Sequence, residues 1–226
     1  MDFILDPVAL RVLGALIEKE VTTPDYYPLS LNALVNACNQ KSNREPVMQL
    51  SEEEVTVALD SLKEKHLVWQ RSVTGARVYK YEHNLRSFYP FSEQETGVLC
   101  VLLLRGPQTV GEVRTRTERL CRFASLDETE GVIRKLMTEE KGPFILELPR
   151  QPGRKEPRFV HLFSGREWAE SFINASSDTV SESMVTVPGG KNLTDRIVEL
   201  ETAVAVLQDE LCALREEFIT LKSELE

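Results

Sequence analysis

A mainly α-helical fold with small β-hairpins is predicted by three observations on the 226-residue chain. Residues 30–82 have the pattern of two helices around a polar turn, followed by two short strands. A similar unit recurs further along the chain, and an unbroken heptad pattern begins at residue 193. Two winged-helix domains in tandem and a C-terminal coiled-coil helix are therefore expected.

The first domain, residues 1–85, opens with a helix. Asp6 supplies an N-cap acceptor and Pro7 suits the first helical position. Apolar residues then recur with helical spacing as far as Glu20. Residues 21–29 contain two prolines, so they are expected to form an extended connection.

The helix-turn-helix and the hairpin come next. Residues 39–46 interrupt the helical pattern with turn-forming side chains and a proline. Ser51 and Glu54 have the spacing of a capping box, which predicts the start of another helix. Residues 67–72 and 77–82 are rich in Val, Trp and Tyr on either side of a turn, as in two paired strands.

The second domain, residues 86–165, repeats this order. Ser92 and Glu95 have the capping-box spacing again, and the apolar residues that follow align with those of the first helix at an offset of 86. Gly106 and Pro107 are a typical helix stop. Two more helices and a second hairpin are expected over residues 110–120, 125–140, 144–148 and 158–163.

The net charge of −9 is concentrated near the end of the chain. Residues 166–226 carry 5 Lys and Arg against 13 Asp and Glu, whereas residues 1–165 carry 22 against 23. Because the two expected domains are close to neutral, local basic patches on them can still attract a nucleic acid.

Composition argues against several classes of protein. The four cysteines lie far apart without a C-x-x-C pair, so buried reduced thiols are expected and a disulfide framework or zinc site is not. No apolar run is long enough to cross a bilayer and no signal peptide is evident, which favours a cytoplasmic protein. His66, His83 and His161 are not grouped, and no nucleophile or phosphate-binding motif occurs, so neither catalysis, a metal nor a cofactor is expected.

Residues 166–191 are expected to form a flexible linker, with a short helix at its start, and residues 192–226 a coiled coil. Flanking charges would attract across a parallel pair, so a parallel homodimer is the leading interpretation. The alternative is an amphipathic helix folded back on its own domains. The a and d positions are Leu193, Ile197, Leu200, Val204, Leu207, Leu211, Leu214, Phe218, Leu221 and Leu225.

Candidate binding residues lie in the polar turn, in one arginine cluster and in the two hairpins. The helices over residues 52–65 and 126–141 are acidic and would repel phosphate, so a backbone grip by other residues is expected. The alternatives are turn closure by the Asn and Ser side chains and a solvated surface whose arginines pair with carboxylates. The candidates are Asn39, Gln40, Lys41, Asn43, Arg44, Arg71, Arg77, Lys80, Arg114, Arg116, Arg150, Arg154, Lys155 and Arg158.

A family resemblance rests on residues 29–48, which read LSLNALVNACNQKSNREPVM. This stretch resembles the signature of the bacterial YceH family of tandem winged-helix proteins, and the likeness extends through residues 103–109, 142–144 and 161–165. The resemblance implies the fold of residues 1–165. It implies no activity and no binding residues.

Two functions are compatible with these patterns. In the first, a non-enzymatic homodimer contacts DNA through its winged helices, as transcription regulators do. In the second, the winged helices are docking surfaces of a protein-binding adaptor, as in accessory subunits of chromosome-condensing complexes. Binding to DNA through several Lys and Arg should weaken steeply with salt, whereas docking through apolar contacts should persist.

Overall fold

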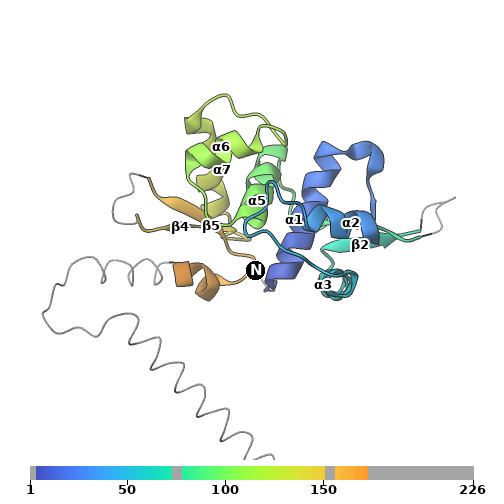
Figure 1. The fold of residues 1–226 in the computed structure, drawn as a ribbon. Helices are drawn as coiled ribbons and strands as arrows, with labels where there is room; N and C mark the ends of the chain where they lie inside the picture. The colour runs from blue at the N-terminus through green and yellow to red at the C-terminus, as the bar shows by residue number, and fades with distance from the viewer. Residues whose placement is uncertain (1–3, 73–77, 151–155, 173–226) are drawn as a thin grey trace, which may run out of the picture. The chain divides into compact units, whose positions relative to one another are not determined.

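The computed structural model describes residues 4–72, 78–150 and 156–172, all within one compact unit, Met1–Val180. The described part is mainly helical, with two small antiparallel sheets (Figure 1). The predicted coiled coil, most of the predicted linker and the tips of both hairpins lie outside the described residues.

In the first half, helices are followed by a hairpin. The elements are α1 (Pro7–Thr22), η1 (Pro24–Tyr26), β1 (Leu29–Ser30), α2 (Leu31–Cys38), α3 (Glu52–Glu64), β2 (Val68–Arg71) and β3 (Lys80–His83). β3 lies between β1 and β2, and all pairings are antiparallel, with Leu29 opposite Tyr81 and Val68 opposite His83.

After one short helix, the second half has the same order of three longer α-helices and a hairpin. The elements are α4 (Leu85–Phe88), α5 (Glu93–Arg105), α6 (Val110–Thr117), α7 (Leu126–Thr138), β4 (Ile145–Leu148) and β5 (Arg158–His161). β4 and β5 are antiparallel, with Ile145 opposite His161. Residues 166–172 are helical, which confirms the short helix predicted there.

The predicted helix starts are confirmed by hydrogen bonds. Asp6 Oδ1 accepts from the backbone N–H of Val8 and Ala9, at 2.8 and 2.9 Å. Ser51 and Ser92 both form complete capping boxes with the glutamate three residues on. The predicted stop of α5 is also confirmed, because Gly106 has a φ of 69°, a left-handed conformation that glycine adopts without strain.

The connection over residues 21–29 differs from the extended segment that was predicted. α1 continues to Thr22, a 3₁₀ turn begins at Pro24, and Leu29 joins the sheet as part of β1. The physical reason is tertiary: Leu29 is buried in the core and its backbone pairs with β3, which local sequence does not reveal. The short helix α4 was likewise not predicted, and it buries Leu85.

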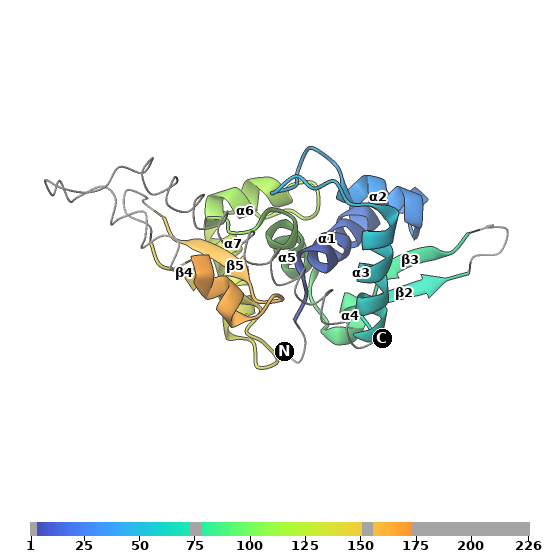
Figure 2. The ribbon, with the colours of Figure 1, turned by 60° about the horizontal axis from the view of Figure 1, so that its bottom comes forward.

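One hydrophobic core runs through both halves, because α1 packs directly against α5 at the centre of the unit (Figures 1 and 2). Gly14 permits the close approach, since a Cβ atom there would lie 2.9 Å from the side chain of Leu104. The thiol of Cys100 donates to the carbonyl oxygen of Gly14 at 3.5 Å. Gly14 and Cys100 are related by the same offset of 86 that relates the two copies in the sequence.

The chain ends of the two halves are also joined. The N–H of Leu5 donates to the carbonyl oxygen of Phe163 at 2.8 Å, and Ser164 Oγ donates to the carbonyl oxygen of Leu5 at 2.8 Å. The predicted boundary between residues 85 and 86 therefore lies within a single continuous core. A surface built by both halves therefore rests on one shared core.

Candidate nucleic-acid interface

The polar turn over residues 39–46 is attached to the second half of the unit. The N–H of Glu45 donates to the carbonyl oxygen of Leu104 at 2.9 Å. One guanidinium N–H of Arg105, the last residue of α5, donates to Asn43 Oδ1. The turn and α5, predicted to lie in different domains, thus meet at one place on the surface.

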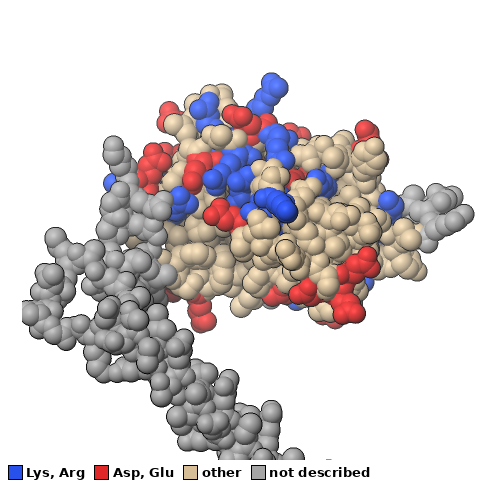
Figure 3. All heavy atoms as spheres, in the orientation of Figure 1, with Lys and Arg blue, Asp and Glu red and all other residues tan. Residues whose placement is uncertain are grey.

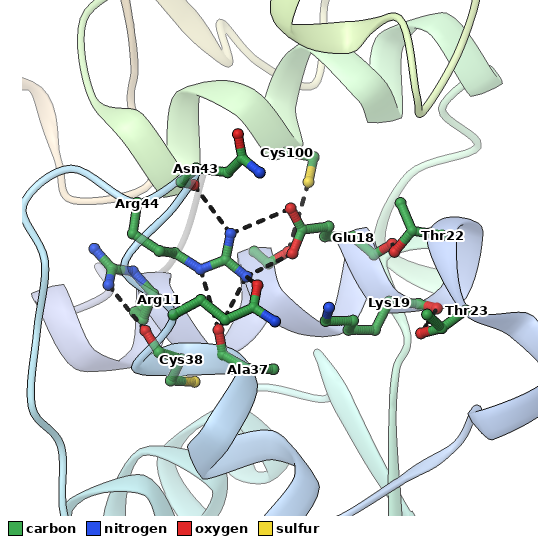
Figure 4. A network of polar contacts seen from close by, with 12 residues as sticks. Arg11, Glu18, Lys19, Thr22, Thr23, Ala37, Cys38, Asn43, Arg44 and Cys100 are labelled. Carbon is green, nitrogen blue, oxygen red and sulfur yellow. Dashed lines mark hydrogen bonds and ion pairs between the residues drawn. The ribbon is translucent and has the colours of Figure 1, made fainter.

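Arg44 anchors this turn from inside. Its guanidinium donates to both carboxylate oxygens of Glu18 on α1, at 2.5 and 3.2 Å, and to the carbonyl oxygen of Ala37 at 2.9 Å (Figure 4). The side chain of Arg44 is 0% exposed and that of Glu18 is 1% exposed. Arg44 was a candidate contact for DNA or a partner, but its guanidinium is buried and paired with Glu18, so it does not face a binding partner.

Asn39 closes the turn through its side chain, which was its structural alternative, and Gln40 also bonds within the turn. The side-chain amide of Asn39 donates to the carbonyl oxygen of Leu50 at 2.8 Å and accepts from the N–H of Leu50 at 2.7 Å. Gln40 Oε1 accepts from Arg44 at 3.2 Å. Lys41 is exposed at the tip of the turn and leaves a cation free to face solvent.

Glu18 also binds an arginine at the surface. Arg119, which follows α6, donates to Glu18 Oε1, and its side chain is 45% exposed. One buried carboxylate therefore faces two guanidinium groups, that of Arg44 inside and that of Arg119 outside. The local balance of charge remains positive.

Arg105, Arg116 and Arg119 form what we term the arginine face. Burial lowers the pKa of Arg105, and the positive charges of Arg116, Arg119 and Arg44 lower it further, while the negative charge of Glu45 opposes them in part. Arg116 has a carboxylate partner only at 3.7 Å, in Glu112. Figure 3 shows Lys and Arg side chains gathered where Figure 1 places α5 and α6.

Arg114 does not belong to this face. It is two residues from Arg116 on a helix, so the two side chains leave α6 in opposite directions. Arg114 instead lines a separate hollow of about 350 Å³ together with Glu118, Arg122 and Phe123. The predicted cluster of arginines around α6 is thus divided between two surfaces.

Two of the described basic residues of the hairpins, Arg158 and Arg71, have local partners. Arg158 donates to the carbonyl oxygen of Pro107 at 2.7 Å and to Glu112 at 3.3 Å. Arg71 pairs with Glu82 at 2.7 Å, and its guanidinium carbon lies 4.5 Å from the centre of the Trp69 ring.

Lys80, half-buried, lies opposite Arg71 in the sheet, and Arg150 is exposed. The remaining hairpin candidates, Arg77, Arg154 and Lys155, lie outside the described residues.

The acidic helices carry a different surface. The first turn of α3 is Glu52, Glu53 and Glu54, and Val57 on the same helix is 70% exposed. A hollow of about 320 Å³ lies beside Val57, lined by residues of α3 and by the start of α1. This acidic surface opposes contact with phosphate and suits a basic partner.

Histidine, cysteine and carboxylate side chains of the described residues form no cluster of three or more that could hold a metal ion. His83 Nε2 bonds Glu20 at 2.8 Å, whereas His161 is stacked on Trp168 with ring centres 4.7 Å apart. Cys38, Cys100 and Cys121 are free thiols. Nor does any described helix combine the length and apolarity needed to cross a bilayer.

Glu18, Arg105 and Arg119 were not among the predicted site residues. The partners of Glu18 are distant in sequence, at residues 44 and 119, so local pattern does not find them. One signal was available: Arg11 and Glu18 are seven residues apart on a helix that is otherwise apolar at its buried positions.

Comparison with known proteins gives matches over the whole chain. "UPF0502 protein VPA1223" of Vibrio parahaemolyticus is 48% identical over 223 residues, covering 97% of this chain and 98% of that protein. "UPF0502 protein PBPRB0676" of Photobacterium profundum is 42% identical over 227 residues, covering 99% and 100%. Residues 5–154 match the family described as "Protein of unknown function, DUF480". The chain therefore belongs to the DUF480 (UPF0502) family of bacterial proteins.

Proposed function

We propose that this chain is a non-enzymatic, cytoplasmic nucleic-acid-binding protein that contacts phosphate groups through the arginine face. The observation that carries the proposal is the convergence of Arg105 from α5, Arg116 from α6 and Arg119 just after α6, beside the polar turn of the first half. Guanidinium groups bind phosphate oxygens in a bidentate manner, which makes arginine the usual residue for this contact.

The finer fold is part of the same proposal. Three helices followed by a hairpin, repeated once, support an assignment of each half as a winged helix, with α3 and α7 in the position of recognition helices. This order also supports equating the DUF480 family with the YceH family that the sequence resembles. The heptad pattern after residue 192 supports a parallel homodimer, which would present two arginine faces to one duplex.

Charge crowding favours an anion at the arginine face. The direct partner of Arg105 is the neutral amide of Asn43, and Arg119 shares Glu18 with Arg44. A phosphate group placed here would relieve repulsion between guanidinium groups that the protein itself leaves incompletely neutralised.

The arginine face and the recognition helices differ in the part of a nucleic acid that they can contact. The first turns of α3 and α7 contain Glu52, Glu53 and Glu54, and Asp127 and Glu128, respectively. Such helices repel the phosphates that border a groove. The proposed contact is therefore with the backbone and is largely independent of base sequence.

The test is binding of the full chain to a duplex DNA, followed by fluorescence anisotropy at several salt concentrations. Arg105→Gln and Arg116→Gln should each weaken binding and reduce the slope of log K against log salt by about 0.9 per lost phosphate contact. Arg134→Gln is the matched control, since Arg134 is exposed on α7 and pairs with Glu130. Equal slopes for all proteins would remove the arginine face from the proposal.

A second candidate function is protein docking by the acidic surface of α3. It is favoured by Val57, an apolar side chain 70% exposed amid carboxylates, which suits a basic partner with an apolar anchor. A pull-down from bacterial lysate, with and without nuclease, separates the two functions. A partner that survives nuclease and high salt, and is lost in Val57→Asp but kept in Arg116→Gln, would favour docking.

A further inference from the structure

A cleft of about 690 Å³ opens where the end of α1 meets the start of α5. It is distinct from the arginine face, none of whose three residues lines it. Its volume lies within the range of about 300 to 1,000 Å³ that small-molecule sites occupy. Both halves contribute to its walls, and such junctions are common places for ligands to bind.

The inner wall of the cleft is apolar. It includes Ile17 from α1, Phe91 just before α5 and Leu120 after α6. Ile17 and Phe91 are buried and Leu120 is half-buried, so these side chains are held in place by the core around them. A ligand with an apolar body would gain mainly from covering Leu120, since Ile17 and Phe91 are only 1% and 7% exposed and serve as a fixed backing.

Two side chains of opposite charge line the cleft and are not held in an ion pair or side-chain hydrogen bond within the described residues. They are Arg86, on α4, and Glu93, on the first turn of α5, and both are exposed. The third charged residue, Glu20, bonds His83 Nε2 at 2.8 Å. That hydrogen bond lowers the pKa of the Glu20 carboxyl, and the positive charge of Arg86 lowers it further.

We propose that this cleft binds a small zwitterionic molecule with an apolar body. The anionic group of the ligand meets Arg86, its cationic group meets Glu93, and its body covers Ile17, Phe91 and Leu120. A zwitterion can meet Arg86 and Glu93 at once, whereas a ligand of single charge can form a charge-assisted hydrogen bond with only one of them.

Ligand binding should also stabilise the folded chain against heat. The ligand would touch α1 and α5 together, the two helices whose packing joins the halves. Because it binds the folded chain only, its presence should raise the unfolding temperature in proportion to the logarithm of its concentration once the site is saturated.

The test uses three probes with the same phenyl body and different charges: phenylalanine, phenethylamine and 3-phenylpropionate. Each is titrated into the full-length chain and followed by saturation-transfer NMR and by thermal unfolding. We expect phenylalanine to bind with a Kd at least tenfold lower than either singly charged probe. Arg86→Gln and Glu93→Gln should each remove that advantage.

Controls separate binding in the cleft from general charge effects. Glu64→Gln and Lys141→Gln, at exposed positions outside the cleft, should leave the Kd for phenylalanine unchanged. Thr96→Trp, which fills the cleft from α5, should abolish binding of all three probes, and Thr96→Leu replaces it if the larger side chain prevents folding.

Three results would overturn the proposal: no binding of any probe, equal binding of zwitterionic and singly charged probes, or full binding by the folded cleft-filling variant. None of them bears on the arginine face, which is measured separately with DNA.

Discussion

The helices α1 and α5 occupy equivalent positions in the two halves and pack against each other, yet they bury different side chains. At the offset of 86, Arg11 of α1 corresponds to Gly97 of α5, and Glu18 corresponds to Leu104. All four residues are buried. One copy of the helix therefore places two charges where the other has a hydrogen atom and a leucine side chain.

The connection after the second helix explains the difference. In the first half residues 39–51 link α2 to α3, whereas the shorter segment 118–125 links α6 to α7. Arg11 donates to the carbonyl oxygens of Cys38 and Pro46, at 3.1 and 2.6 Å, and Glu18 holds Arg44. The buried charges of α1 thus fasten a long polar turn, and α5 has no such turn to fasten.

The largest expected effect comes from making α1 resemble α5 at this position. Glu18→Leu copies Leu104 but leaves the Arg44 guanidinium buried without a counter-charge. Removing one partner of a buried ion pair costs about 3–5 kcal/mol of unfolding free energy. Equilibrium unfolding in urea, with the unmodified chain alongside, measures this loss.

The double variant Glu18→Leu with Arg44→Leu is the matched control, because replacing both partners by apolar side chains avoids the unpaired charge. It should regain most of the lost stability. A single variant as stable as the unmodified chain would show that the turn is fastened by other contacts.

The contact between the two helices can be broken at Gly14. In Gly14→Val the new Cβ would lie 2.9 Å from the side chain of Leu104, so this side chain or the two helices must shift, and overpacking of this kind costs about 1–3 kcal/mol. Gly111→Ala in α6 is the control, since no atom lies within 4 Å of its added Cβ. Thermal unfolding should show a lower midpoint for the first variant and an equal or higher midpoint for the second.

The second strand of each hairpin ends in a histidine, His83 in β3 and His161 in β5, but the two histidines have different neighbours. His83 bonds Glu20, whereas His161 is stacked on Trp168. Burial lowers the pKa of His161 to about 3, below the value of about 6.5 expected in the unfolded chain. The unfolded chain therefore binds more protons between these two values, and the unfolding free energy should fall as pH drops below about 6.5. The slope is at most about 1.4 kcal/mol per pH unit.

Urea unfolding of the unmodified chain and of His161→Phe, at pH 7.5 and at pH 5.0, tests this expectation. The phenyl ring keeps the stacking on Trp168 and cannot bind a proton, so its variant should lose less stability between the two pH values. Equal losses would mean that His161 does not limit stability in acid.

The order of helices and strands could be predicted from the sequence because it depends on short-range signals. Apolar periodicity and the serine and glutamate pairs located α1, α3, α5 and α7 to within a few residues. The candidate site could not be predicted in the same way. Arg119 lies 101 residues from Glu18, and only the packing of α1 on α5 brings the two together.

The smallest expected effect concerns the starts of the matched helices α2 and α6. The Thr109 hydroxyl accepts from the N–H of Glu112 at 3.2 Å, and the Glu112 carboxylate accepts in return from the N–H of Thr109 at 2.9 Å. Ser30 makes only one such bond, to the N–H of Ala33 at 3.4 Å, but it also belongs to β1, which pairs with β3. Thr109→Ala should therefore lower the unfolding free energy by about 1 kcal/mol, and Ser30→Ala by less. If urea unfolding gave equal losses for the two variants, α2 would depend on its N-cap as much as α6 does. The pairing of β1 with β3 would then not stabilise the start of α2.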